Sequence, residues 1–140
     1  MERNYKRSIF FNELSNFFEY ERDYVVLSAY SRDNKMLGAL LLFFYEDFVE
    51  YYIPAQNLDG RKMQVMTRLI TEGFRIASEK GLRFWNWGGT RMDQESLRHF
   101  KGRWGAKEYM YGFYNKHDRS LELHENDLAT HFSGFYVLKM

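Results

Sequence analysis

Apolar residues recur along the chain with two different periods, and each change of period marks a new element. Steps of three and four residues among Phe10, Leu14 and Phe17 predict a helix over Ser8–Glu21. Pro54 lacks the amide that a strand ladder needs and is expected to end the strand before it. Strand-forming residues predict three strands before this proline, the first two as a hairpin: Tyr24–Ser31, Met36–Tyr45 and Phe48–Ile53.

The second half of the chain opens with its clearest helix. A wide apolar stripe predicts this helix over Met63–Lys80, with Asp59 as its N-cap and Gly81 as its C-terminal stop. Leu82–Trp87 reads as a strand, and Gly88-Gly89 allows the backbone to turn out of it. The order of elements predicts an α/β (α+β) fold with a mixed, mostly antiparallel sheet and helices on both faces.

A shorter helix and two strands complete the predicted elements. Thr90-x-x-Asp93 resembles a capping box, and the helix after it carries Leu97, Phe100 and Trp104 on one side. Gly105 is expected to close this helix. The last two strands are expected over Ala106–Tyr114 and Phe132–Lys139.

Length and composition narrow the class of protein. The 140 residues suit one domain over 1–140, and the absence of cysteine excludes disulfides, thiolate metal sites and a catalytic thiol. Aromatic residues make up 19% of the chain, which is too many for a disordered protein. No apolar run is long enough for a membrane span and no signal peptide opens the chain, so we expect a soluble cytoplasmic protein.

The net charge of +1 hides an uneven distribution. Residues 61–107 hold eleven Lys and Arg against four acids, a local charge of +7, and the rest of the chain carries −6. Such a cluster attracts an anionic ligand, although solvated helix faces also gather basic residues by chance.

One segment carries a specific resemblance. Gly88-Gly89-Thr90 ends a strand, and Phe100-Lys101-Gly102-Arg103-Trp104-Gly105-Ala106 follows after a short helix. This arrangement resembles the Fem-type group of the GNAT acyltransferase superfamily, which includes peptidoglycan aminoacyltransferases and CelD-like enzymes. The resemblance extends over about Tyr24–Tyr114 and implies the GNAT fold.

The resemblance implies a donor site and a reacting centre. In the GNAT fold the strand that ends at Gly88-Gly89 diverges from its neighbour, and the acyl-carrying arm of the donor enters the gap. Asn86, Trp87 and Thr90 would then border the donor, although strand alternation points Asn86 and Trp87 to opposite faces. Phe100 and Lys101 are implied at the reacting centre. A lysine beside a buried stripe is suited to hold an oxyanion or a phosphate, and an exposed lysine with a packed stem is the alternative.

Gln56–Lys62 is the segment where GNAT enzymes hold the pyrophosphate of coenzyme A. Arg61 and Lys62 would add positive charge to a helix N-terminus there. The usual glycine-rich spacing is absent and Asp59 adds negative charge, which weakens the assignment of coenzyme A as the donor. The Fem-type resemblance implies aminoacyl-tRNA instead, since the peptidoglycan members of that group take their acyl group from it.

The general base is left open by the sequence. Glu46, Asp47 and Glu50 lie near the third strand, where GNAT enzymes sometimes keep one. Tyrosines could act as acids or as packing residues, and no metal site is expected from the histidines that recur every seven residues. These are Tyr109, Tyr111, Tyr114, His117, His124 and His131.

The leading hypothesis is therefore an N-acyltransferase, with a role in cell-wall or polysaccharide metabolism. It would move an acyl or aminoacyl group from acyl-CoA or aminoacyl-tRNA to an amine. Because Fem-type enzymes generally have two such domains, the second hypothesis is a non-catalytic binding module, an RNA-contacting domain, or a half-enzyme that acts as a homodimer or with a partner. A third hypothesis is a plain coenzyme A-dependent acetyltransferase of small molecules.

Overall fold

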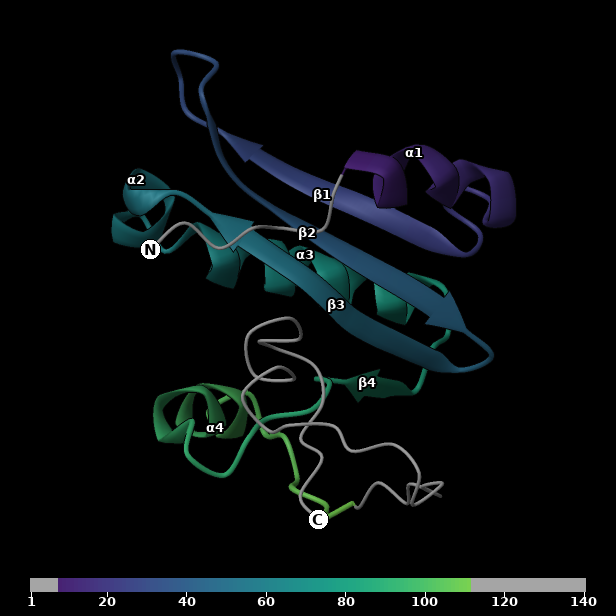
Figure 1. The fold of residues 1–140 in the computed structure, drawn as a ribbon, viewed down its shortest axis with the longest axis vertical. Coiled ribbons are helices and arrows are strands. Elements are labelled where there is room, and N and C mark those ends of the chain that lie inside the picture. Colours follow the sequence, from purple (N-terminus) through teal and green to yellow (C-terminus); the bar gives the residue numbers. More distant parts are fainter. Residues whose placement is uncertain (1–7, 112–140) are drawn as a thin grey trace, which may run out of the picture. The chain divides into compact units, whose positions relative to one another are not determined.

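A computed structural model describes residues 8–111 of the 140-residue chain (Figure 1). Residues 1–106 form one compact unit and residues 107–140 a second, so a single domain over 1–140 stays a prediction. None of the helices within 8–111 has the length and apolar character that crossing a bilayer requires. In chain order the elements are α1 (Ser8–Phe17), β1 (Tyr24–Tyr30), β2 (Met36–Tyr45), β3 (Phe48–Gln56), α2 (Leu58–Lys62), α3 (Val65–Glu79), β4 (Phe84–Asn86) and α4 (Glu95–Gly102).

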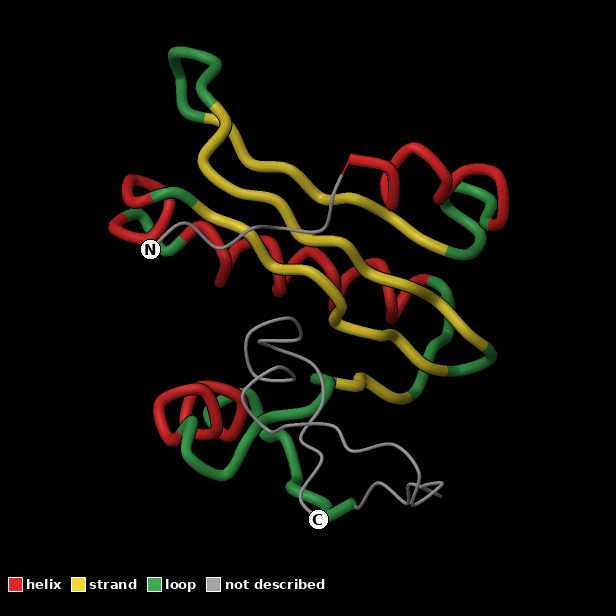
Figure 2. The backbone as a smooth tube through the Cα atoms, in the orientation of Figure 1, coloured by secondary structure: helices red, strands yellow, loops and turns green. Residues whose placement is uncertain are grey.

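The four strands form one sheet in the order β1-β2-β3-β4, visible as the yellow segments of Figure 2. β1, β2 and β3 are antiparallel neighbours, and β4 pairs with β3 in parallel after the crossover through α3. A parallel neighbour requires such a crossover, whereas antiparallel neighbours need only a hairpin. The predicted fold class, a mixed and mostly antiparallel sheet with helices on both faces, is confirmed.

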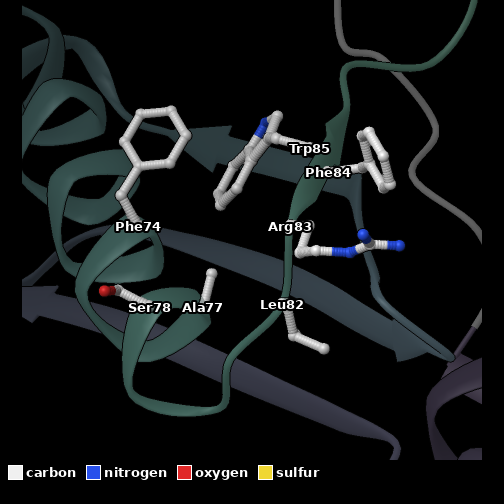
Figure 3. Close-up of a pocket in the computed structure, with 7 residues that line it drawn as sticks. All are labelled: Phe74, Ala77, Ser78, Leu82, Arg83, Phe84 and Trp85. Atoms are coloured by element: carbon white, nitrogen blue, oxygen red, sulfur yellow. The ribbon is translucent and has the colours of Figure 1, made fainter.

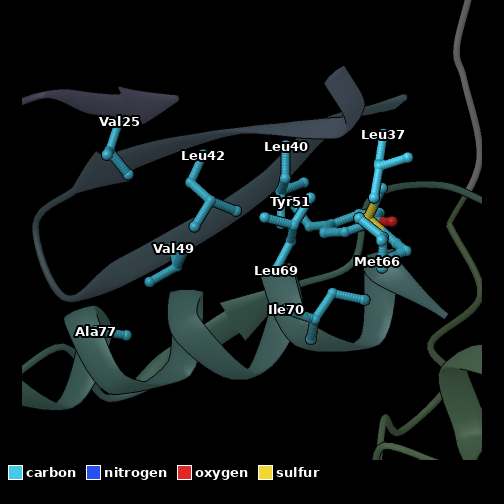
Figure 4. Close-up of a cluster of buried hydrophobic side chains, with 11 residues drawn as sticks. Val25, Leu37, Leu40, Leu42, Val49, Tyr51, Met66, Leu69, Ile70 and Ala77 are labelled. Atoms are coloured by element: carbon cyan, nitrogen blue, oxygen red, sulfur yellow. The ribbon is translucent and has the colours of Figure 1, made fainter. Parts of the chain in front are cut away.

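The larger core lies between α3 and one face of the sheet (Figure 4). Leu40, Leu42 and Val49 point from β2 and β3 toward Ile70 of α3, and all four side chains are fully buried. Burying side chains of this size stabilises the fold by about 1.5–3 kcal/mol each. The stripe predicted on the long helix is therefore the surface that fixes α3 to the sheet.

The smaller core lies on the opposite face, under α1. Leu14 of α1 packs with Tyr24 and Leu41, all three buried. The Phe18 ring meets Phe43 edge to face, with their centroids 5.3 Å apart. The first helix ends at Phe17 and not at Glu21, because the Asp23 carboxylate accepts the Glu19 amide and Glu21 takes a left-handed φ of 65°.

The third strand does not end at Pro54, contrary to the sequence-based expectation. β3 continues to Gln56, and Pro54 lies opposite Leu40 of β2. β4 has already left the other side of β3 after Glu50. Proline is tolerated on a strand that has a free edge, because no ladder bond is lost there.

The start of the long helix also differs from the prediction. Asp59 is not its N-cap: Asn57 caps the short α2 by accepting from the Gly60 amide at 2.8 Å, and donates to the Met36 carbonyl. Gln64, with a left-handed φ of 53°, then separates α2 from α3. The Asn57 amide caps α2 with one hydrogen bond and connects it to β2 with the other, an arrangement that helical periodicity does not reveal.

The helix ends follow the glycines, as predicted. Gly81 (φ 71°) and Gly105 (φ 81°) take left-handed conformations, and the amides around them return to carbonyls of the preceding helical turn. The capping box at Thr90 is wrong, because α4 begins at Glu95 after Gln94. Ala106–Tyr111 is not a strand; the rest of that predicted strand, and the strand over Phe132–Lys139, lie outside the described residues.

Gly60→Ala is expected to destabilise the fold by about 1–3 kcal/mol. A Cβ at this position would lie 2.2 Å from the Leu37 carbonyl oxygen, so the α2 backbone has to move away from β2. Gly102→Ala is the matched control, since it is also helical and has nothing within 4 Å. Urea denaturation of both variants checks the prediction, and equal stability of the two would contradict it.

Candidate functional site

The strands β3 and β4 diverge after a short paired stretch. Pairing covers only Phe48–Glu50 with Phe84–Asn86, and β3 then runs on to Gln56 without β4 beside it. The chain after β4 turns at Gly88, whose φ of 68° is left-handed. The expected divergence of the strand that ends at Gly88-Gly89 is therefore present, and beyond Glu50 one edge of β3 has no strand partner among residues 8–111.

Aromatic side chains close this divergence on the α3 side. The Trp87 ring lies 5.2 Å from Tyr51 of β3 and 6.2 Å from Phe100 of α4, between ring centroids. All three tryptophans of the chain belong to one aromatic cluster. The members of this cluster, which we call the tryptophan cluster, are Tyr51, Phe74, Trp85, Trp87, Phe100 and Trp104.

The opposite face at the same point is polar. Alternation directs Asn86 and Glu50 away from the tryptophan cluster, and the Asn86 side chain hydrogen-bonds to Glu50. The Asn86 side-chain oxygen also accepts a hydrogen bond from the Gly88 amide, with the nitrogen and oxygen 3.0 Å apart. Asn86 and Trp87 thus lie on opposite faces, as expected, and the polar one of the two lies beside a carboxylate.

Lys101 is the buried charged residue of the described core, with 8% of its surface exposed. Its ammonium donates three hydrogen bonds, to the Gly88 carbonyl at 3.1 Å, the Gly89 carbonyl at 3.3 Å and the Thr90 hydroxyl at 2.6 Å. These bonds use all three N–H groups of the side chain. Lys101 therefore connects α4 to the 88–90 loop, and in this arrangement has no N–H left for a substrate.

Two opposite charges share this half-buried region. Burial raises the pKa of the Glu50 carboxyl, while the Asn86 hydrogen bond and the charge of Lys101 act against the rise. Burial lowers the pKa of the Lys101 ammonium, and Glu50 acts against that shift. Of the three candidate bases, Glu50 is the one whose environment favours taking up a proton. Asp47 instead pairs with Arg83, and Glu46 is exposed in the turn before β3.

The predicted phosphate segment does not form a glycine-rich loop. Arg61 and Lys62 are both exposed in the last turn of α2. The first two amides of α3, those of Val65 and Met66, have no hydrogen-bond acceptor among the described residues, and Gln64 supplies no side-chain cap. The groups suited to bind phosphate therefore lie in two places: the basic side chains are at the end of α2, and the backbone amides without an acceptor are at the start of α3.

The remaining candidates contribute less to the site. Tyr109 and Tyr111 are exposed, and Tyr114, His117, His124 and His131 lie outside the described residues. Within 8–111, no group of three His, Asp or Glu side chains is placed to hold a metal ion. Several cations of the basic 61–107 region are paired with carboxylates, which weakens its field; these are Arg75, Arg83 and Arg91.

A cavity of about 230 Å³ lies at the other end of β4, away from the 88–90 loop (Figure 3). Polar and apolar atoms contribute equally to its surface, and its only charged group, Arg83, pairs with Asp47. The lining residues are Phe74, Ala77, Ser78, Leu82, Arg83, Phe84 and Trp85. The groups that can move a proton lie at the divergence of β3 and β4 and not in this cavity.

The Glu50 carboxyl is expected to titrate above 4.5, the usual glutamate value, and Lys101→Met is expected to raise its pKa further. Burial raises the pKa of Glu50, and removing the Lys101 cation takes away one of the interactions that lower it. Because its folded-state pKa is raised, the stability that Glu50 contributes is complete at low pH and is lost as the pH rises through that pKa. Carbon-13 NMR of labelled glutamate measures the titration, and a pKa that falls in the variant would contradict this assignment.

Comparison with solved structures finds acetyltransferases that share this fold. Aminoglycoside acetyltransferase meta-AAC0020 from an uncultured soil metagenomic sample, in complex with sisomicin, matches with a TM-score of 0.58 and 20% identity, over 83% of this chain and 79% of that one. HMB0005, an aminoglycoside acetyltransferase also from an uncultured soil metagenomic sample, matches with a TM-score of 0.57 and 16% identity, over 82% of this chain and 77% of that one.

A third match is aminoglycoside 6'-N-acetyltransferase AAC(6')-Ih from Acinetobacter baumannii, with a TM-score of 0.62 and 13% identity over 82% of this chain and 83% of that one. No protein-family model matches the sequence, and neither does any curated protein. At these identities the likeness shows a shared fold, the GNAT fold that the sequence resemblance implied. The Fem-type subgroup is not confirmed.

Proposed function

We propose that this chain is an N-acyltransferase that moves an acyl group from acyl-CoA to an amine. The observation that carries the proposal is the divergence of β3 and β4 beside a half-buried carboxylate, in a fold shared with acetyltransferases. The edge of β3 beyond Glu50, which pairs with no other described strand, offers backbone groups to an extended donor arm. A helix bundle or a closed sheet would offer no such edge.

Glu50 is the residue best suited to accept the proton of the acceptor amine. The amine nitrogen attacks the thioester carbonyl carbon, the carbon–sulfur bond breaks and coenzyme A leaves as the thiolate. The proton that the nitrogen must lose passes to the Glu50 carboxylate. A raised pKa makes this carboxylate a stronger base than an exposed glutamate, and the Asn86 hydrogen bond orients it.

The donor phosphates fit the start of α3. The unpaired amides of Val65 and Met66 point along the helix axis toward any anion there, and the helix dipole adds to their attraction. Arg61 and Lys62 supply mobile positive charge from the preceding turn of α2. Coenzyme A is the donor that this arrangement and the acetyltransferase neighbours support best.

Aminoacyl-tRNA stays the alternative donor, since the Gly88-Gly89-Thr90 and Phe100-Lys101 motifs resemble those of Fem-type enzymes. The acceptor is an amine. A role of this protein in cell-wall or polysaccharide metabolism, and its action as a homodimer, rest on that resemblance alone. A non-catalytic module is the second candidate, because the tryptophan cluster already fills the α3 side of the divergence.

Acetyl-CoA is expected to change the intrinsic fluorescence and to raise the melting temperature. Every tryptophan of the chain lies in the tryptophan cluster, so a donor arm between β3 and β4 alters all of the signal. At one hundred times Kd a ligand stabilises the folded state by about 2.7 kcal/mol. Desulfo-coenzyme A and an aminoacyl-tRNA are titrated in parallel. No response to any of the three would favour the non-catalytic module.

Glu50→Gln is expected to lower kcat about 10²- to 10⁴-fold and to leave the KM for the donor little changed, because it removes the proton acceptor and keeps the shape. Glu46→Gln removes the same charge from the exposed turn before β3 and serves as the matched control. The measurement is thiol release from acetyl-CoA against a panel of amines, over a range of pH. Equal rates for the two variants would rule out Glu50 as the base.

A further inference from the structure

The 88–90 loop has two backbone amides that donate to no group in the described part of the chain. Among residues 8–111, neither the Gly89 amide nor the Thr90 amide has a hydrogen-bond acceptor, whereas the Gly88 amide donates to Asn86. Gly89 is exposed and Thr90 is partly exposed, so this part of the loop lies at the surface. Two adjacent free donors in a loop are a common way for backbone to bind an anion.

The direction of these amides follows from the bonds that Lys101 makes. The Gly88 and Gly89 carbonyls both accept from its ammonium. In a trans peptide the N–H points opposite to the C=O, so the Gly89 and Thr90 amides both point away from Lys101. One buried cation thereby holds two peptide groups in the same orientation, with their carbonyls toward it and their N–H groups away from it. Its charge also polarises them, which strengthens their outward N–H groups as donors.

The loop lies beside the carboxylate at the divergence. A Cβ built on Gly88 would lie 3.6 Å from Glu50 Oε1 and 3.9 Å from the Tyr51 carbonyl oxygen of β3. The loop that carries the two amides therefore begins beside the proposed base. When Glu50 takes a proton it becomes neutral, so it no longer opposes negative charge that develops nearby.

We propose that the Gly89 and Thr90 amides form the oxyanion-binding pair of the site, and that Lys101 is a positioning residue that holds them. This inference rests on the proposed function for the identity of the anion, which is the oxygen of the acyl carbonyl during attack by the amine. Lys101 acts through the loop and does not touch the reacting atoms. Its fixed peptide groups need no reorganisation as the charge develops.

The test uses the full chain with nitrogen-15 glycine, threonine and lysine, and acetate as a stable carboxylate probe that needs no turnover. In the wild type, acetate is expected to move the Gly89 and Thr90 amide protons downfield while the Lys101 ammonium signal stays unchanged. In Lys101→Met both amide shifts are expected to fall at least threefold. Unmoved amides in the wild type, equal shifts in the variant, or a shift of the ammonium signal itself would overturn the proposal.

Turnover supplies the second measurement. Lys101→Met is expected to lower kcat about 10²- to 10³-fold, as the loss of an oxyanion donor does, with the donor KM within threefold. Thr90→Val removes one acceptor of the ammonium but keeps both amides and the side-chain shape, so a smaller fall in kcat and in the acetate shifts is expected. This variant keeps the proposal testable if Lys101→Met does not fold.

Arg103→Met is the matched control, because it removes a positive charge from the exposed end of α4 and should change neither measurement. The two proposals fail in different ways. Acetate shifts that depend on Lys101 in a protein without acyl transfer would overturn the proposed function and keep the anion site. Acyl transfer without amide shifts, or a kcat for Lys101→Met equal to that of Arg103→Met, would overturn the anion site alone.

Discussion

A buried ammonium must find acceptors, and this requirement organises the part of the molecule where chemistry is expected. Lys101 meets it with two carbonyls and a hydroxyl from the 88–90 loop. Without such partners, moving the charge out of water would cost several kcal/mol. The bonds connect α4 to the chain that follows β4, so the course of the loop beside Glu50 depends on one side chain.

The fold was largely predictable because its strongest determinants are local. The β2 strand was placed at its observed ends, and α3 within two residues, since a continuous apolar run and a wide helical stripe leave few alternatives. The left-handed Gly81 and Gly105 were recognisable for the same reason: glycine after a helical stripe is a common C-terminal stop.

The errors arose where distant residues decide the conformation. The choice of Asn57 over Asp59 as a cap depends on the Met36 carbonyl, which lies on another strand. The short α1 depends on the Asp23 carboxylate. In the site, the 88–90 loop and Lys101 were identified from their motif, but periodicity cannot show that the ammonium turns toward the loop carbonyls. Glu50 was one of three candidate acids until burial and Asn86 distinguished it.

Within the described part of the chain, the edge of β3 beyond Glu50 has no strand partner, and this affects how the protein behaves in a crowded solution. An unpaired strand edge is a template on which another chain can add a strand, the first step toward aggregation. Pro54 lies on this edge, and a proline offers no N–H to an incoming strand. The same residue obstructs a neighbouring polypeptide and leaves the carbonyls around it available to a small molecule. A protein that must keep a sheet partly open for a ligand can in this way keep it closed to other proteins.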